Sequence, residues 1–148
     1  MKQVIFALQF KGTAGPVEGA EGKLWAKTSA SSQVLRTTLG EGGIAGSVEP
    51  AGGESITFES EVNSMADGAF VESGTIRYGS AGTVSFRTVG RGTMAPSAIE
   101  GLQRGAVVWE VVAAQGRLAG ATGLITSNFS VGPMGEVIDN QFAQLLLP

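Results

Sequence analysis

Carboxylic acids that alternate with apolar residues on predicted strands are the groups of this sequence best suited to chemistry. Glu72 alternates with Phe70 and with Tyr78, the only tyrosine of the chain, and Glu110 stands within a run of valines. Alternate residues of a strand share one face. Burial on an apolar face raises the pKa of a carboxyl group, which can then act as an acid or a base near neutral pH. We therefore take Glu72, Glu110 and Tyr78 as candidate catalytic residues.

A second set of residues could bind a ligand beside these groups. Thr126 and Asn128 share one face of a later strand, where the Asn128 amide could hold a carbonyl or alkoxide oxygen. Phe58, Phe70 and Trp109 would supply apolar contacts. Such a set could support proton transfer or electrostatic control of a cyclisation. Two alternatives stay open: both glutamates point to solvent, as charged strand residues usually do, or Trp109 only fills the core of a small barrel.

The composition excludes several kinds of chemistry and partner. The chain has neither cysteine nor histidine, which removes thiol catalysis, disulfides, histidine-based triads and the usual zinc or haem ligands. No phosphate loop or dinucleotide fingerprint is present, so we expect no metal and no cofactor. The formal net charge is −3, and the lysines and arginines are scattered singly, which argues against a nucleic-acid partner.

No membrane segment is expected either. The longest apolar runs fall far short of the roughly 20 residues that a membrane-spanning helix needs. The N-terminal run 4–10 is too short for a signal peptide and is interrupted by Gln9, so we interpret it as the first strand. The sequence therefore predicts a cytoplasmic protein.

Strand patterns recur along the whole chain with short turns between them. Asp67-Gly68 and the segment 79–82 are typical of tight hairpins. This pattern predicts one all-β domain over residues 1–148, an antiparallel meander closed into a barrel of about eight strands. The predicted strands are 4–10, 23–28, 33–39, 43–49, 55–65, 69–78, 83–89, 107–112, 124–131 and 136–147.

The segment 115–123, QGRLAGATG, resembles the glycine-rich segment of the allene oxide cyclase-like barrels. That calycin-like group includes dirigent proteins and bacterial spirotetronate cyclases, and short bacterial all-β proteins are similar in the same half. Leu118 stands where the pattern usually has an aromatic residue. The resemblance implies an eight-stranded antiparallel barrel with a cavity along its axis that is often oligomeric, so a homo-oligomer is expected.

Three segments have more specific predictions. The glycine-rich segment 11–22 is expected to be a long loop, either a lid over a barrel mouth or a mobile surface loop. Ser97 and Glu100 have the spacing of a capping box, which predicts a short helical insert near 96–104 that plugs the core or gates a ligand. The apolar C-terminal strand 136–147 is expected to close the barrel against the first strand.

These features support three functions. The leading hypothesis is a cofactor-independent cyclase or isomerase that acts on a small hydrophobic molecule in the barrel cavity. The second is a noncatalytic barrel that binds such a molecule. The third is a structural or partner-binding barrel with a filled interior.

Overall fold

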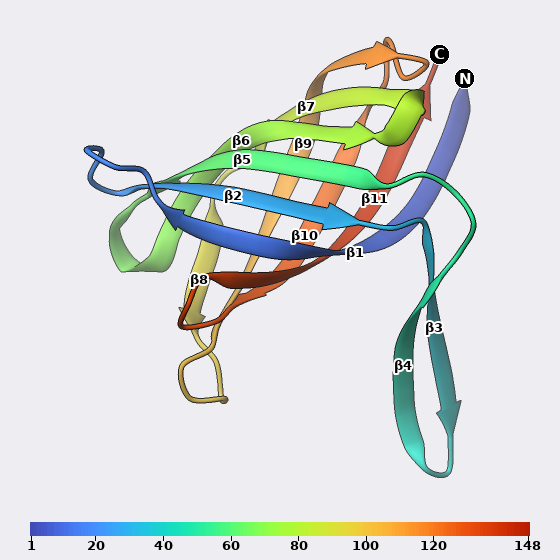
Figure 1. Cartoon of the computed structure of the whole chain (residues 1–148). Coiled ribbons are helices and arrows are strands. Elements are labelled where there is room, and N and C mark those ends of the chain that lie inside the picture. The colour runs from blue at the N-terminus through green and yellow to red at the C-terminus, as the bar shows by residue number, and fades with distance from the viewer.

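The computed structural model describes residues 1–148, and its main body is a closed antiparallel barrel of eight strands (Figure 1). The chain also forms a two-stranded hairpin outside the barrel. The predicted all-β barrel is thus confirmed, and so is the closure of its last strand against its first. The wall runs in the order β1 (Lys2–Pro16), β2 (Lys23–Ala30), β5 (Ile56–Ser64), β6 (Ala69–Tyr78), β7 (Gly82–Thr88), β9 (Gln103–Gly116), β10 (Thr122–Val131) and β11 (Glu136–Leu147).

Alternation of buried and exposed residues follows from the closed wall, because each strand presents one face to the interior and one to solvent. Strand β11 is the clearest case: every second residue from Val137 to Leu145 is buried. Strand β5 buries Ile56 and Phe58 in the same way. The sequence pattern predicted both strands for this reason.

The turn between β5 and β6 is the tight hairpin that Asp67-Gly68 predicted. It is the short 3-10 turn η1 (Ala66–Gly68), in which Asp67 has φ 59° and Gly68 has φ 77°. Aspartate and glycine tolerate this left-handed region better than most residues, which suits them to hairpin turns. A second 3-10 turn, η2 (Gly79–Ala81), joins β6 to β7 as predicted.

One position in the wall is occupied by two collinear strands. Strand β7 pairs with β6 and with the second half of β9, and β8 (Gly92–Pro96) pairs with the first residues of both. The two strands are interrupted between Thr88 and Gly92. There the Thr88 hydroxyl accepts a hydrogen bond from the Glu72 backbone N–H at 2.7 Å and donates one to the Glu72 carbonyl at 2.9 Å. The side chain of Thr88 thus takes the place of a neighbouring strand's backbone as the hydrogen-bond partner of the Glu72 backbone.

Strands β3 (Gln33–Gly40) and β4 (Gly43–Pro50) form at the predicted places but lie outside the barrel wall. They pair only with each other, in a hairpin that projects from the end of the barrel where both termini lie (Figure 1). We call this hairpin the arm. Its base is attached to β1 by Gln33, whose side chain accepts a hydrogen bond from the Gln9 backbone N–H at 2.6 Å.

The predicted long loop over 11–22 is wrong in its first half, because β1 continues to Pro16. The glycines there belong to the wall. A Cβ atom at Gly12 would lie 2.1 Å from the Lys27 carbonyl oxygen on the neighbouring strand. Glycine therefore marks a close approach of two backbones at this position, and a turn was the wrong interpretation. The connection itself covers only 17–22.

The predicted helical insert near 96–104 is also wrong. Strands β8 and β9 form a hairpin, and residues 97–102 between them are turns and bends. The Ser97 hydroxyl accepts a hydrogen bond from the Ile99 N–H at 3.0 Å, which is a local turn contact and not a helix cap. Ile99, within the segment that was expected to plug the core or gate a ligand, is 67% exposed.

The plug comes from the opposite end of the barrel. Leu118 and Ala121, in the glycine-rich connection between β9 and β10, are buried in the main core cluster. Phe6, Tyr78 and Leu147 pack against this cluster. The barrel is therefore filled at the end that carries the termini. None of its helical turns is long or apolar enough to span a bilayer.

Candidate functional site

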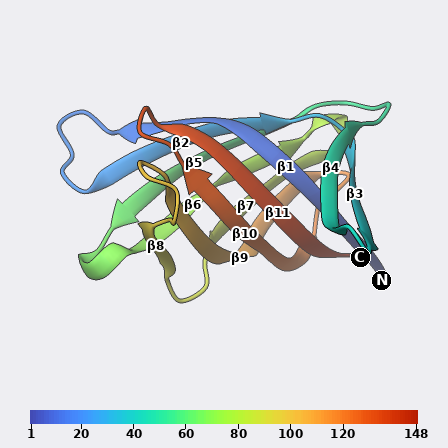
Figure 2. The same cartoon turned by 90° about the horizontal axis from the view of Figure 1, so that it is seen from below.

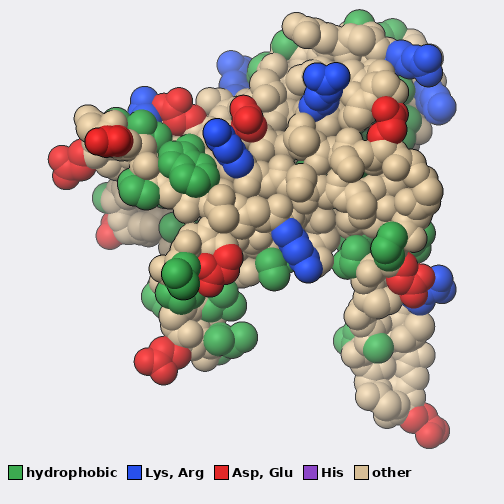
Figure 3. All heavy atoms as spheres, in the orientation of Figure 1, with side chains coloured by type: hydrophobic (Ala, Val, Ile, Leu, Met, Phe, Trp, Pro, Cys, Tyr) green, Lys and Arg blue, Asp and Glu red, His purple; other side chains and the backbone are tan.

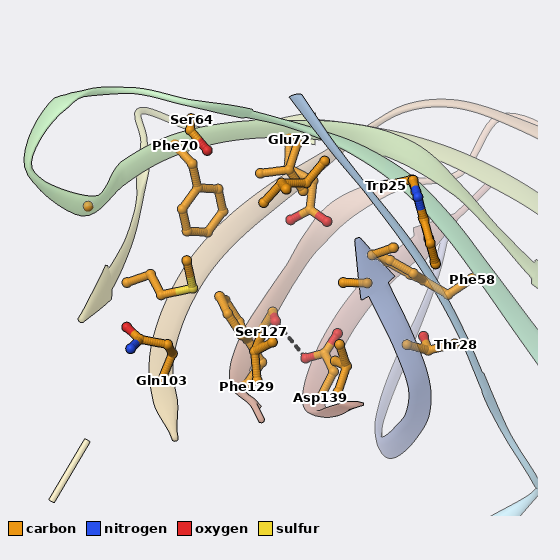
Figure 4. Close-up of a pocket in the computed structure, with 18 of the residues that line it drawn as sticks. Trp25, Thr28, Phe58, Ser64, Phe70, Glu72, Gln103, Ser127, Phe129 and Asp139 are labelled. Carbon is orange, nitrogen blue, oxygen red and sulfur yellow. Dashed lines mark hydrogen bonds between the residues drawn. The ribbon is translucent and has the colours of Figure 1, made fainter. Parts of the chain in front are cut away.

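A cavity of about 190 Å³ occupies the other half of the barrel (Figure 4). Its mouth is at the end formed by the β1–β2, β5–β6, β8–β9 and β10–β11 connections (Figure 1). Most of its lining is apolar. Six polar side chains from strands of the wall also line it: Thr28, Ser64, Glu72, Gln103, Ser127 and Asp139.

Aromatic rings form the floor of this cavity. Trp109 is 1% exposed and packs against Phe86, with ring centroids 4.5 Å apart, and against Phe58 at 5.4 Å. Phe58 also stacks on Phe86 at 5.4 Å. Such contacts hold the rings in fixed positions. Trp109 and Phe58 therefore separate the cavity from the filled half of the barrel and touch both.

Glu72 presents a carboxyl group to the cavity from β6. The pKa of this carboxyl is raised to about 7, mainly by burial and to a lesser extent by the negative charge of Asp139, against the opposing effect of a hydrogen bond from Ser60. The Ser60 hydroxyl, on the adjacent β5, donates to Glu72 Oε2 at 2.5 Å. Glu72 is thus able to gain and lose a proton near neutral pH. The prediction that Glu72 points inward is confirmed.

Asp139 faces the same cavity from β11 (Figure 4). Burial raises the pKa of its carboxyl as well. Two donors favour its ionised form: the Ser127 hydroxyl at 2.6 Å from Oδ1 and the Gln141 amide at 2.8 Å from Oδ2. Because the charge of Asp139 raises the pKa of Glu72, and two donors favour the ionised form of Asp139, the first proton that the pair takes up resides mainly on Glu72.

Two polar atoms in the lining lack a hydrogen-bond partner. They are the hydroxyl of Thr28 and the indole N–H of Trp109, and both are buried. The indole N–H is directed toward Glu72 and helps to lower the pKa of that carboxyl, although the two groups do not have the geometry of a hydrogen bond. Unpaired buried polar groups cost free energy. A ligand with an oxygen acceptor would satisfy them.

Three predicted site residues lie on the outer surface. Glu110 is directed outward, and its Oε1 accepts a hydrogen bond from Arg87 Nε at 2.7 Å. Thr126 and Asn128 are exposed, while the intervening Ser127 is buried. The inward orientation assumed for these three residues is therefore wrong.

The physical reason for the wrong orientation differs between β9, which carries Glu110, and β10, which carries Thr126 and Asn128. On β9 both faces carry valines, so alternation alone does not identify the inner face, and the bulky Trp109 takes the interior position. On β10 the inner face carries Ile125 and the small, polar Ser127, which pairs with Asp139. The other inner residues of this strand at the cavity, Phe129 and Val131, are apolar, so the polar side chains Thr126 and Asn128 lie together on the outer face.

Tyr78 points inward, but it lies at the filled end of the barrel. Its ring packs edge to face on Phe6 at 5.5 Å. Six residues separate it from Glu72 along β6, which corresponds to roughly 20 Å. Tyr78 is therefore not brought together with Glu72, and burial raises the pKa of its phenol well above the usual value. Of the predicted binding residues, Phe58, Phe70 and Trp109 do line the cavity.

Asp139, the second carboxyl of the site, was not among the residues predicted from the sequence. A signal was present, because Asp139 shares the apolar face of β11 with Val137, Ala143 and Leu145. This is the same pattern that identified Glu72. Ser60 and Ser127 had no comparable signal, since serine is common on either face of a strand.

The cavity has a distinct electrostatic character. No lysine or arginine lines it, although two carboxyl groups do. An anionic ligand would meet like charge without a compensating cation, so the arrangement suits a neutral molecule. No group of three or more acidic side chains is placed to hold a metal ion.

Comparisons with protein-family models, with curated proteins and with solved structures found no match for this chain. The resemblance to allene oxide cyclase-like barrels therefore stays a prediction.

Proposed function

We propose that the protein is a cofactor-independent isomerase or cyclase that acts by proton transfer on a small, neutral, hydrophobic molecule. The observation that carries the proposal is the Glu72 carboxyl, which lies in an apolar cavity opposite Asp139 and has a pKa of about 7. A general acid–base group works best when its pKa lies near the working pH.

The two carboxyl groups divide the work in this proposal. Glu72 carries the exchangeable proton, since its pKa is raised by the charge of Asp139, whereas Ser127 and Gln141 donate hydrogen bonds that favour the ionised form of Asp139. Protonated Glu72 can give its proton to a substrate atom and, once ionised, take one from another atom of the same molecule. The indole N–H of Trp109 and the hydroxyl of Thr28 are free to hold a substrate oxygen.

The dimensions of the cavity limit the substrate. Its volume of about 190 Å³ compares with roughly 150 Å³ for an apolar protein cavity that accepts benzene. A drug-sized ligand needs roughly 300 Å³ or more. We therefore expect a molecule about as large as one substituted ring, with a carbonyl or hydroxyl oxygen.

Deuterium incorporation tests the proposal across a panel of candidate substrates. Small monocyclic ketones and enols are incubated with the protein in D₂O. Mass spectrometry reports deuterium uptake, and proton NMR reports conversion to isomers of equal mass. Wild-type protein is expected to accelerate exchange in at least one compound. Glu72→Gln is expected to abolish the acceleration while the compound still binds, as ligand-detected NMR would show.

Glu110→Gln is the matched control, because it makes the same chemical change on the outer face of the wall. It is expected to retain full activity. Equal loss in both variants, or exchange that persists in Glu72→Gln, would contradict the assignment of Glu72. Binding without exchange in the wild type would favour the noncatalytic ligand-binding function.

A further inference from the structure

The arm formed by β3 and β4 has one apolar face with nothing covering it. Leu35 pairs with Val48 and Leu39 with Ile44, so these four side chains share one face of the ribbon. Leu39 is 74% exposed and Ile44 is 82% exposed. The opposite face carries Val34, Thr38, Ala45 and an ion pair between Arg36 and Glu49, with an N–O distance of 3.0 Å.

A two-stranded hairpin of this kind has little stability of its own. Both of its outer edges are unpaired, and an isolated two-stranded hairpin is at best marginally stable in water. Figure 3 shows the arm as a column of atoms that stands clear of the barrel. Its apolar face is therefore expected to be covered by something outside the chain.

A second unusual surface lies on the barrel, where β1, β10 and β11 run side by side near the termini. The outward positions there carry no charged residue; they are Gln3, Ile5, Ala7, Gln9, Thr122, Leu124, Thr126, Asn128, Asn140, Phe142, Gln144 and Leu146. We call the surface formed by these twelve residues the uncharged face. Ile5, Leu124 and Phe142 are each about half exposed on it.

The opposite part of the barrel surface is different. The outward positions of β2, β5, β6 and β7 include at least one charged residue on every strand, namely Lys23, Lys27, Glu59, Glu61, Arg77 and Arg87. Depletion of charge together with exposed apolar and amide side chains distinguishes the centre of protein interfaces from ordinary surface. The uncharged face therefore has the composition of a protein contact.

The arm and the uncharged face lie on the same side of the molecule. The arm extends below the barrel in Figure 1, and Figure 2, seen from that side, shows β1, β10 and β11 together with the arm toward the viewer. A partner placed against this side would contact both surfaces. A two-fold axis there would bring each arm to the partner's barrel, because such an interface uses the same patch on both subunits.

The area that such a dimer would bury is large enough for a specific interface. One face of a two-stranded ribbon of this length covers roughly 250 Å². Two arms and the two surfaces that receive them would bury on the order of 1,000 Å² before any contact between the barrels, which is about the lower limit for a specific interface. A charged or highly polar partner would leave these apolar side chains poorly matched.

We propose that this side of the molecule is a homodimer interface, in which the apolar face of each arm and the uncharged face of each barrel are covered by a second copy of the chain. The proposal is independent of the cavity and of its chemistry. It also explains why the arm has an apolar face although it contributes nothing to the barrel core.

Sedimentation velocity over a dilution series of the whole chain tests this proposal. The wild type is expected to be a dimer in the micromolar range. Leu39→Lys with Ile44→Lys is expected to weaken dimerisation by tenfold or more, because both anchors would carry a charge into the interface. Leu124→Lys with Phe142→Lys should do the same from the barrel side.

Two controls separate this effect from added charge alone. Thr38→Lys with Ala45→Lys changes the opposite face of the same arm, and Thr57→Lys with Thr75→Lys changes exposed positions on the charged half of the barrel. Both should dimerise as the wild type does, and far-ultraviolet circular dichroism should show that every variant folds.

A wild type that stays monomeric across the series would overturn the proposal, as would an arm variant that dimerises as tightly as the wild type. Binding of a monomeric wild type to phosphatidylcholine vesicles, lost in the arm variant, would assign the apolar face to a membrane surface and overturn it as well.

Discussion

Glu72 and Asp139 face one cavity from opposite sides of the barrel wall. Their strands, β6 and β11, are separated by three strands in one direction around the barrel, and by three in the other. The charge of Asp139 raises the pKa of Glu72 across this space. Two carboxyl groups without a cation between them are costly to bury. The stability of the fold at different pH values and the titration of the two carboxyl groups therefore test this arrangement directly.

The stability of the fold is predicted to fall as the pH rises from about 4.5 to about 7. In this range the unfolded chain has lost the Glu72 proton while the folded protein retains it, so each rise in pH favours unfolding. For a shift of this size the loss is about 3 kcal/mol. Denaturant unfolding at a series of pH values measures it.

Glu72→Gln should remove most of this pH dependence, because glutamine does not titrate. Asp139 would leave a dependence of the same sign, since burial raises its pKa as well. A free energy of unfolding that rises over the same range in the wild type would contradict a buried, protonated Glu72.

The two neighbours of Glu72 are predicted to shift its pKa in opposite directions. Asp139→Asn removes a negative charge and should lower the pKa of Glu72. Ser60→Ala removes the hydroxyl that donates at 2.5 Å and should raise it. Carboxyl ¹³C chemical shifts of glutamate-labelled protein report both. Shifts of the same sign in the two variants would show that these contacts do not control the titration.

Trp109→Ala is predicted to destabilise the fold by about 3 to 5 kcal/mol, since it removes a fully buried ring from the aromatic floor. Val112→Ala on the same strand is the control. Val112 is 50% exposed, so the change should stay within about 0.5 kcal/mol. Similar losses in the two variants, measured by denaturant unfolding, would contradict the position of Trp109.

Gly12→Ala is predicted to destabilise the barrel by about 1 to 3 kcal/mol, because its new methyl group would collide with the Lys27 carbonyl on β2. Gly42→Ala, at the tip of the arm, adds the same group where no atom lies within 4 Å. Thermal unfolding should show a clear loss only for Gly12→Ala. An unchanged melting temperature would mean that β1 and β2 do not approach this closely.

The sequence predicted the barrel better than it predicted the site. Strands such as β5 and β11 alternate strictly, and only one face of each can be buried, so their orientation follows from the pattern. Glu72 was found by the same logic. Strand β9 has valines on both faces, and there the assignment of Glu110 to the interior was wrong.

Other features depend on contacts between distant residues. Gly12 is a wall position only because Lys27 approaches it, and locally it looks like part of a loop. The strands of the arm were predicted, but their exclusion from the wall is decided by the pairing of β2 with β5. Tyr78 lies away from the cavity because its end of the barrel is filled. Leu118, from the connection between β9 and β10, is one of the residues that fill that end.

The most direct test of the proposed site is the carboxyl ¹³C titration of Glu72 in the wild type, assigned by comparison with Glu72→Gln. We predict that this one glutamate titrates with a pKa of about 7, and that a bound neutral ligand shifts its resonance. A pKa near the ordinary value of 4.5 would mean that the Glu72 carboxyl is in contact with water, and it would contradict both the buried site and its proposed role in proton transfer.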